Sequence, residues 1–582
     1  MNNKICFLIL TPLGDIRKNA KKVYLGEWCK LYNRKEYFLK NTEVISYHWS
    51  SVSKFQKDFK YINLIYELLI KELSKKLNEV HNVNNSDQYW RIVVGPWLFD
   101  FISVLYDRWE VIKSFISKRN SKYKKIICIS ASYKKESFLY SDYETFINNV
   151  TTDHWNNYIF SELIKKYTYI PLKNISSKEK YEPYTQKLNW KKHILNLINW
   201  LLGFLVKKRD IFIILPYFKY YLNVLLQLKF KQFPFLWQTI SLKRYKIDWN
   251  IRKWNEWAKL KNSSFFFSII QDLIPLNIPK IYLEGYKNSI LHSENLSWPT
   301  NPKFIFSSVS YINDDLFKIW LAKKKELKTK LIIGQHGGAM FISKHHNIEN
   351  HNKKIADKIL TWGYSEKKNK KIIKGINFSS PINNVKPKTN GGILFINYDL
   401  PRYTENIDSV YKGPLALNYI KEKIIFFKNL NYNALSSVVI NTKKIPVNYK
   451  WFENLRFKDV GLELNFSNNT LNNDLKKSAL CVTNLNATSF LHTFNINFPT
   501  IIFFNKLQLR DSALLSFKKL NEAGVYFNNP IDAARQINNI LPNIDVWWAS
   551  KKVQSAVLEF TNKYTRRTEA LTNNLYYLFK KF

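Results

Sequence analysis

The chain has 582 residues, of which 46% are hydrophobic and 16% aromatic, and this composition excludes a disordered protein or a single small domain. Its formal net charge of +45 favours anionic partners, such as nucleotide phosphates, acidic glycans or an anionic membrane surface. The basic residues are spread along the chain and no zinc-finger or RNP pattern occurs, so no nucleic-acid partner is expected.

Apolar segments of the chain are too short to cross a bilayer. Leu197–Val206 is about ten residues long and Ile211–Leu228 is interrupted by Lys219, whereas a span needs roughly 20 apolar residues. The opening sequence, MNNKICFLILTPLGD, has too short an apolar run for a secretory signal and no cleavage site of small residues. We therefore expect a cytoplasmic protein, and its charge is compatible with peripheral contact at the inner membrane.

Short β-like runs alternate with longer helical patterns from the N-terminus onward, which indicates an α/β fold with parallel sheets. In the first half the pattern predicts strands at Ile5–Leu10, Arg91–Gly95, Lys125–Ser130, Asp210–Leu215 and Lys280–Glu284. It predicts helices at 62–80 and 97–117, where apolar residues recur every three or four positions.

The second half begins with a strand at 303–307, a helix at 314–328 and a strand at 331–333, the order of a βαβ unit. Further strands are predicted at 358–362, 392–397, 437–440, 479–483 and 500–504, and the chain is helical from Val546 onward. We place a domain boundary near Trp298 and Pro299, where a proline-containing stretch interrupts the pattern.

The predicted architecture is two Rossmann-like domains that face a cleft, residues 1–300 with a helical excursion and residues 301–545. C-terminal helices at 546–582 are expected to pack back on them. Several fold families pair two doubly wound domains in this way, and the pattern alone does not choose among them.

A glycine-rich loop, GQHGG from Gly334 to Gly338, follows the predicted strand at 331–333. Loops at the carboxyl ends of parallel strands bind ligands, and glycines let a substrate approach the backbone. His336 can transfer a proton near neutral pH, so we predict that it is a catalytic general base or a hydrogen-bond donor to a phosphate. Gln335, Gly337 and Gly338 are predicted to bind the phosphates of a donor.

Histidines and carboxylates are frequent just after this loop, at His345, His346, Glu349, His351 and Asp357. Their spacing contains no HExxH motif and no cysteine ligand, so we expect no metal site. Exposed loop side chains are the simpler interpretation of these histidines.

A second candidate site lies within residues 479–504, which read as strand, polar turn, helix and strand. Asn486, Thr488 and Ser489 would stand at the start of the helix, where N-cap side chains and unpaired N–H groups bind anions. An ordinary capped helix explains the same residues. The segment 479–504 lies in the same half of the chain as the GQHGG loop, and this favours the interpretation as a phosphate site.

Residues outside these two loops are weaker candidates. Glu27 is an alternative general base, and Trp28, Gly95 and Trp97 are candidates for the acceptor side of a site, the last by stacking on a sugar or a base. A surface glutamate and core tryptophans explain them equally well. Arg402, shortly after the predicted strand at 392–397, is placed to hold a phosphate through a bidentate contact.

Several multi-residue blocks occur in order along the chain, roughly over residues 5–110 and 303–565. They include YLGEWCKLY, YWRIVVGPWLFDFISVLYDRW, IIGQHGG, DKILTWGY, PRY, NATSFLHTFNINFPTIIFF and VWWASKKVQSAVLEF. Together these blocks resemble the LIC12162 family of transferases, found among proteins of bacterial O-antigen and surface-carbohydrate biosynthesis.

The resemblance implies a GT-B-like fold, with the N-terminal domain on the acceptor side and the C-terminal domain on the nucleotide-donor side. GT-B enzymes generally need no essential metal. The positions that the resemblance carries over are Gly26, Glu27, Trp28, Gly95, Pro96, Gln335, His336, Gly337, Gly338, His346, Trp362, Gly363, Pro401, Arg402, Thr488 and Pro499.

One departure from the family pattern is His492, where the pattern has a glutamate. In GT-B enzymes an acidic residue near this place often holds the donor ribose. The histidine therefore leaves the identity of the donor, and the activity itself, open.

We predict a glycosyltransferase that moves a sugar from a nucleotide-sugar donor to a surface polysaccharide, O-antigen or lipid-linked glycan acceptor, without a cofactor. Two alternatives stay open. One is a phosphotransferase that uses a CDP-alcohol and makes a glycerol-phosphate type of product. The other is a catalytically inactive protein of the same fold that binds a nucleotide or a glycan.

Overall fold

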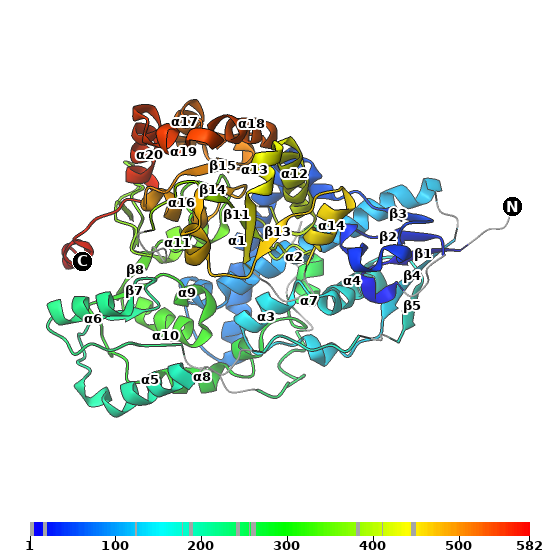
Figure 1. Cartoon of the computed structure of the whole chain (residues 1–582). Coiled ribbons are helices and arrows are strands. Elements are labelled where there is room, and N and C mark those ends of the chain that lie inside the picture. Colours follow the sequence, from blue (N-terminus) through cyan, green and yellow to red (C-terminus); the bar gives the residue numbers. More distant parts are fainter. Residues whose placement is uncertain are drawn as a thin grey trace.

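Three parallel β-sheets form the framework of the computed structural model (Figure 1). It describes residues 5–15, 20–122, 125–176, 179–185, 190–239, 245–254, 257, 264–379, 385–409, 411–443 and 450–582. Each sheet is built from one continuous stretch of chain, and we call them the N-terminal, middle and C-terminal sheets. All their strand pairs are parallel, so the predicted α/β class is confirmed.

The strands of each sheet follow a simple order. The N-terminal sheet has the order β3-β2-β1-β4-β5, with β1 (Cys6–Ile9), β2 (Lys22–Tyr24), β3 (Thr42–Val44), β4 (Ile126–Ala131) and β5 (Leu172–Ile175). The middle sheet has the order β10-β9-β8-β7-β6, with β6 (Phe212–Ile214), β7 (Phe304–Ser307), β8 (Lys330–Gly334), β9 (Lys358–Leu360) and β10 (Ile372–Ile373). The C-terminal sheet has the order β13-β12-β11-β14-β15-β16, with β11 (Gly392–Tyr398), β12 (Val438–Lys443), β13 (Asn465–Ser467), β14 (Ser478–Thr483), β15 (Thr500–Phe503) and β16 (Tyr526–Phe527).

Helices connect and cover these strands. Those before β11 are α1 (Val52–His81), α2 (Asp87–Lys122), α3 (Tyr143–Asn149), α4 (Asp153–Tyr167), α5 (Trp190–Leu201), α6 (Tyr220–Lys229), α7 (Phe265–Leu273), α8 (Tyr286–Glu294), α9 (Ser310–Asn313), α10 (Asp315–Glu326) and α11 (Asn347–Ile355). Those after β11 are α12 (Ala416–Asn429), α13 (Tyr432–Ser436), α14 (Glu453–Asp459), α15 (Leu471–Leu475), α16 (Thr488–Asn495), α17 (Asp511–Glu522), α18 (Pro530–Ile540), α19 (Ile544–Ala549), α20 (Lys551–Tyr564) and α21 (Leu571–Lys580).

The middle sheet differs from the predicted division into two domains at residue 300. It takes β6 from before that residue and β7 to β10 from after it, so the predicted boundary falls inside one sheet. The middle and C-terminal sheets line a common cavity, and the N-terminal sheet is a third unit, which the sequence pattern did not separate from the rest of residues 1–300. The predicted helical C-terminus is confirmed: α20 packs on α16 and α17, and α21 packs on α6 of the middle unit.

Helix α2 is surrounded by other elements over most of its length. Residues 89–112 are all buried, and they contact α1, α4, α10 and α11 (Figure 1). The prediction of a strand and a turn at Arg91–Gly95 is therefore wrong, because a short continuous apolar run does not distinguish a buried strand from a buried helix. The strand predicted at Lys280–Glu284 is also wrong, since Lys280–Tyr282 forms a short 3-10 turn.

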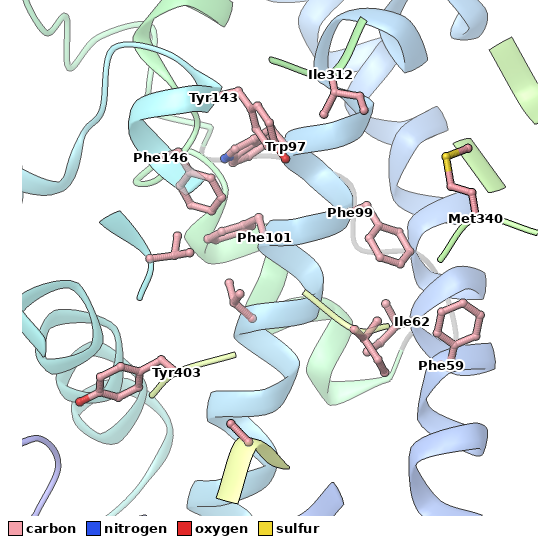
Figure 2. Packing of buried hydrophobic residues seen from close by; sticks show 14 of the residues in the cluster. Phe59, Ile62, Trp97, Phe99, Phe101, Tyr143, Phe146, Ile312, Met340 and Tyr403 are labelled. Atoms are coloured by element: carbon pink, nitrogen blue, oxygen red, sulfur yellow. The ribbon is translucent and has the colours of Figure 1, made fainter. Parts of the chain in front are cut away.

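Two predicted acceptor-side residues, Gly95 and Trp97, belong to the packing of α2. A Cβ atom at Gly95 would lie 2.7 Å from the hydroxyl of Tyr66, so glycine allows α1 and α2 to pack closely. Trp97 is fully buried and stacks on Phe101, with ring centroids 5.2 Å apart. Figure 2 shows both rings on the side of α2 that faces Phe146.

A buried ion pair attaches the segment after β11 to the N-terminal unit. Arg402 donates to the Asp153 carboxylate at 2.7 Å and to the backbone carbonyl of Trp28. The hydroxyl of Tyr403 donates to the same carboxylate at 2.6 Å. Arg108 of α2 donates to the carbonyl of Thr404 at 2.8 Å. Residues 402–404 therefore join the N-terminal unit to the start of the C-terminal sheet.

We expect that Arg402→Met and Asp153→Asn each lower the free energy of unfolding by about 3–5 kcal/mol, because each leaves its partner charge buried and unpaired. The double variant should lose less free energy of unfolding than the sum of the losses of the two single variants. Urea unfolding measures all three, with Lys519→Met as a control, because Lys519 and Glu559 form an exposed pair worth at most about 1 kcal/mol. Additive losses from the two single variants would contradict the coupling.

Candidate functional site

A cavity of about 950 Å³ lies between the carboxyl ends of the middle and C-terminal sheets. It is lined from the middle unit by Leu215, Pro216, Tyr217, Phe218, Lys219, Tyr220, Val309, His336 and Ser379. From the C-terminal unit it is lined by Ile396, Asn397, Tyr398, Asn441, Leu471, Thr488, Ser489 and His492. Among these described residues none carries a carboxylate, so the lining favours an anionic or neutral ligand.

The C-terminal wall of the cavity lies where the order of its sheet reverses. β11 lies between β12 and β14, so the strand that follows β11 in the chain lies on one side of the β11–β14 pair and the strand that follows β14 lies on the other. Ligands of open α/β sheets bind at such a switch point. The end of β11 supplies Tyr398, and α16 after β14 supplies Thr488, Ser489 and His492.

The first turn of α16 faces the cavity without a side-chain cap. Its N-cap residue is Ala487, which has no side-chain hydrogen bond to the helix. Thr488 accepts a hydrogen bond through Oγ1 from the backbone N–H of Gly338 at 2.9 Å. The positive end of the α16 dipole therefore borders the cavity.

The GQHGG loop connects the two walls of the cavity. A Cβ atom at Gly338 would lie 2.7 Å from the Cα atom of Thr488, so only glycine permits this approach, whereas a Cβ atom at Gly337 would meet open space. Gln335 is buried and braces the loop, since its amide accepts from the Trp362 N–H at 2.8 Å and donates to the Gly337 carbonyl at 3.0 Å. Of the four predicted residues in this loop, only His336 lines the cavity.

Two histidines from opposite walls line the same cavity, His336 and His492. Burial lowers the pKa of His336 to about 4, with a smaller effect from the neighbouring His346, and burial lowers the pKa of His492 to about 4. Both imidazoles are therefore neutral at pH 7. The Nδ1 atom of each is buried with no hydrogen-bond partner among the described residues.

Tyr217 and its loop were not anticipated from the sequence. Leu215 has a φ angle of 41° and Tyr217 one of 67°, which are strained values for residues with a Cβ atom. The Tyr217 ring lies 6.2 Å from the His336 ring. Its position directly after the predicted strand at 210–215 was the available signal, because that strand is parallel to β7 and β8 and ends at the same edge.

Several predicted site residues lie outside the cavity. Arg402 and Trp28 are buried in the N-terminal interface, so the predicted phosphate contact of Arg402 is replaced by its ion pair with Asp153. Trp28 stacks on Phe160 at 5.7 Å. Glu27 pairs with Lys30 at 3.1 Å in a short 3-10 turn of the N-terminal unit. Asn486 is fully buried and donates to Ser343 at 3.1 Å.

The histidines after the GQHGG loop are packed into the protein rather than exposed. His346 caps α11 by accepting from the Glu349 N–H, and the His345 ring lies 4.2 Å from Phe59. Burial lowers the pKa of His351 to about 3. Within the ranges that the structure describes, no three His, Cys, Asp or Glu side chains gather into a metal site.

We expect Gly338→Ala to lower the free energy of unfolding by about 1–3 kcal/mol, because the added methyl group would push the loop away from α16. Gly337→Ala is the matched control, since its methyl group would enter open space and should change stability little. Urea unfolding compares the two variants. Equal effects would show that the loop does not depend on its approach to Thr488.

The lowered pKa values of His336 and His492 predict an acid-dependent loss of stability. Between pH 6.5 and about pH 4 the unfolded chain binds protons that the folded chain does not, so the free energy of unfolding falls as the pH falls. Above that window these two groups add no pH dependence. We expect His492→Gln to flatten the fall, measured by urea unfolding at several pH values. An unchanged pH dependence in this variant would contradict the burial effect on His492.

Comparisons with known proteins give one assignment. A search of curated protein sequences finds no match. Among solved structures, similarity is found to the S. aureus MnaA-UDP co-structure (10% identity, 62% of this chain, 100% of that chain, TM-score 0.34). Similarity is also found to the spinosyn rhamnosyltransferase SpnG, with 8% identity over 64% of this chain and 100% of that chain and a TM-score of 0.31. A third similar structure is Acinetobacter baumannii MurG, with 10% identity over 55% of this chain and 89% of that chain and a TM-score of 0.31. These similarities are too weak to assign an activity. The model of the LIC12162 family transferases, however, matches residues 6–577, and the chain therefore belongs to this family of transferases.

Proposed function

We propose that this transferase is a glycosyltransferase, which moves a sugar from a nucleotide-sugar donor to a surface polysaccharide, O-antigen or lipid-linked glycan acceptor. The observation that carries the proposal is the cavity at the switch point of the C-terminal sheet, where the start of α16 and two neutral histidines meet. The family supplies the reaction class, group transfer.

The donor phosphates fit the C-terminal wall of the cavity. The uncapped first turn of α16 offers N–H groups and a positive helix end, and Lys219 from the facing wall adds a full positive charge. No carboxylate among the described lining residues opposes a phosphate. Tyr217, Tyr220 and Tyr398 provide aromatic surface for a sugar or a base.

His336 is the proposed general base. Its neutral imidazole can accept the proton of an acceptor hydroxyl while the oxygen forms a bond to the anomeric carbon. The bond from that carbon to the phosphate oxygen breaks at the same time, and the nucleotide leaves with the electron pair. A neutral His492 on the opposite wall can form a hydrogen bond with the donor. It occupies the place where the family resemblance suggested an acidic residue.

A thermal-shift screen of the full chain against CMP, CDP, UDP, GDP and ADP tests donor binding. We expect one nucleotide to raise the melting temperature, because a ligand at 100 times its Kd adds roughly 2.7 kcal/mol to the stability of the folded state. Lys219→Glu should weaken this binding at least about tenfold through charge reversal at the cavity. Lys303→Glu, an exposed lysine elsewhere, is its control. No shift with any nucleotide would contradict the proposed donor site.

Replacement of the base tests catalysis. We expect His336→Ala to slow nucleotide release from the matching nucleotide sugar at least about 100-fold while nucleotide binding persists, since a positioned base contributes roughly 10²–10⁴-fold. His292→Ala on α8 is the control. A rate within tenfold of the unmodified protein would contradict the role of His336. A glycerol-phosphate product would identify a phosphotransferase, and binding without release a binding protein.

A further inference from the structure

Helix α5 presents its apolar side to solvent. None of its residues is buried. Trp190, Ile194, Leu197, Ile198 and Leu201 follow one another at helical spacing along one stripe, and their side chains are between 43% and 64% exposed. A helix of a soluble protein normally buries such a stripe against its core.

The polar side of α5 is the side that contacts the protein. Lys192 donates to the hydroxyl of Thr239 at 3.1 Å, and Asn199 donates to the carbonyl of Leu236 at 3.2 Å. Asn196 lies within 3.5 Å of the Thr239 carbonyl. These three residues recur at spacings of four and three, so they mark the face opposite the apolar stripe. The helix is thus attached by hydrogen bonds in the orientation that leaves its apolar stripe outside.

The apolar surface continues past the end of α5. Trp200 is 66% exposed and Phe204, in the following 3-10 turn, is 80% exposed. Lys207, Lys208 and Arg209 come next and are all exposed. We call the stripe together with Trp200 and Phe204 the α5 face, and Figure 1 shows α5 at the lower edge of the molecule.

We propose that the α5 face binds the surface of an anionic lipid bilayer, with α5 lying in the plane of the interface. Charge complementarity selects this partner: three exposed basic residues border the apolar surface, and the whole chain carries a net charge of +45. Tryptophan at both ends of the helix, Trp190 and Trp200, suits the boundary between acyl chains and headgroups. An apolar stripe, basic residues and aromatic side chains together are the signature of an interfacial helix.

Insertion across the bilayer is not part of this proposal. A helix of 12 residues is about 18 Å long, whereas the hydrocarbon core is about 30 Å thick. In the described part of the chain, no helix is long and apolar enough to cross a membrane. The binding is therefore peripheral and reversible, and it does not depend on the proposed glycosyl transfer.

Vesicle sedimentation of the full chain tests the proposal. We expect binding to vesicles of mixed phosphatidylcholine and phosphatidylglycerol, and much weaker binding to phosphatidylcholine alone. Leu197→Glu/Ile198→Glu should lower the partition coefficient at least about tenfold, because each change removes apolar area and adds a repelled charge. The matched control is Leu515→Glu/Leu558→Glu, since both leucines are 63% exposed on other helices.

The basic border has its own variant, Lys207→Gln/Lys208→Gln/Arg209→Gln. Each lost charge should weaken binding to anionic vesicles about fivefold, and the difference should disappear at high salt. If the stripe variant binds vesicles as well as the unmodified chain, the α5 face is not the membrane surface. If the unmodified chain does not bind vesicles and is a dimer, and Leu197→Glu/Ile198→Glu is a monomer, then the α5 face joins two copies of the chain. That result would overturn the proposal.

Nucleotide stabilisation separates this proposal from the proposed function. Leu197→Glu/Ile198→Glu leaves the cavity untouched, so its thermal shift with the selected nucleotide should equal that of the unmodified chain. A chain that binds vesicles but no nucleotide would contradict the donor site alone. A chain that binds a nucleotide but no vesicles would contradict the α5 face alone.

Discussion

Residues 89–112 of α2 are buried on every side, and the three units are arranged around them. An apolar helix that has no solvent-facing side must be enclosed, and residues 89–112 are enclosed by helices of the N-terminal and middle units. Arg108 is hydrogen-bonded inside this packing, since it donates to Asp107, Asn156 and the Thr404 carbonyl. The last of these bonds reaches the C-terminal half, so one helix contacts all three units.

The cavity exists because two of these units meet at the carboxyl ends of their sheets. Neither sheet forms it alone: His336 comes from the middle sheet, and His492 from the helix after β14. The contact of Gly338 with Thr488 fixes their approach, and the C-terminal helices cross back to the middle unit, where the Asn377 N–H donates to the Arg566 carbonyl at 2.7 Å. A site shared in this way responds to any change in the position of one unit against the other.

The GQHGG loop could be recognised from the sequence because it combines a strand pattern with a characteristic turn. Single residues outside such a motif could not be assigned to a site in this way. A short apolar run followed by glycines and one histidine has few structural alternatives, and the strand and its loop lie where they were expected. Arg402, Trp28 and Trp97 have side chains that serve equally well in a site or in a core, and their neighbours in space come from distant parts of the chain. The apolar segment 197–206 was too short to cross a membrane, and only the structure shows that most of its large apolar side chains face solvent.

Local periodicity and turn residues were enough to predict the α/β class, most strands of the middle and C-terminal sheets, and the position of His336 at a strand end. Long-range packing was needed to establish that residues 91–95 are helical, that the middle sheet takes strands from both sides of residue 300, and that Arg402 pairs with Asp153. It also decided which face of α5 is outside. These features depend on contacts between residues far apart in the chain, and a local sequence pattern does not predict such contacts.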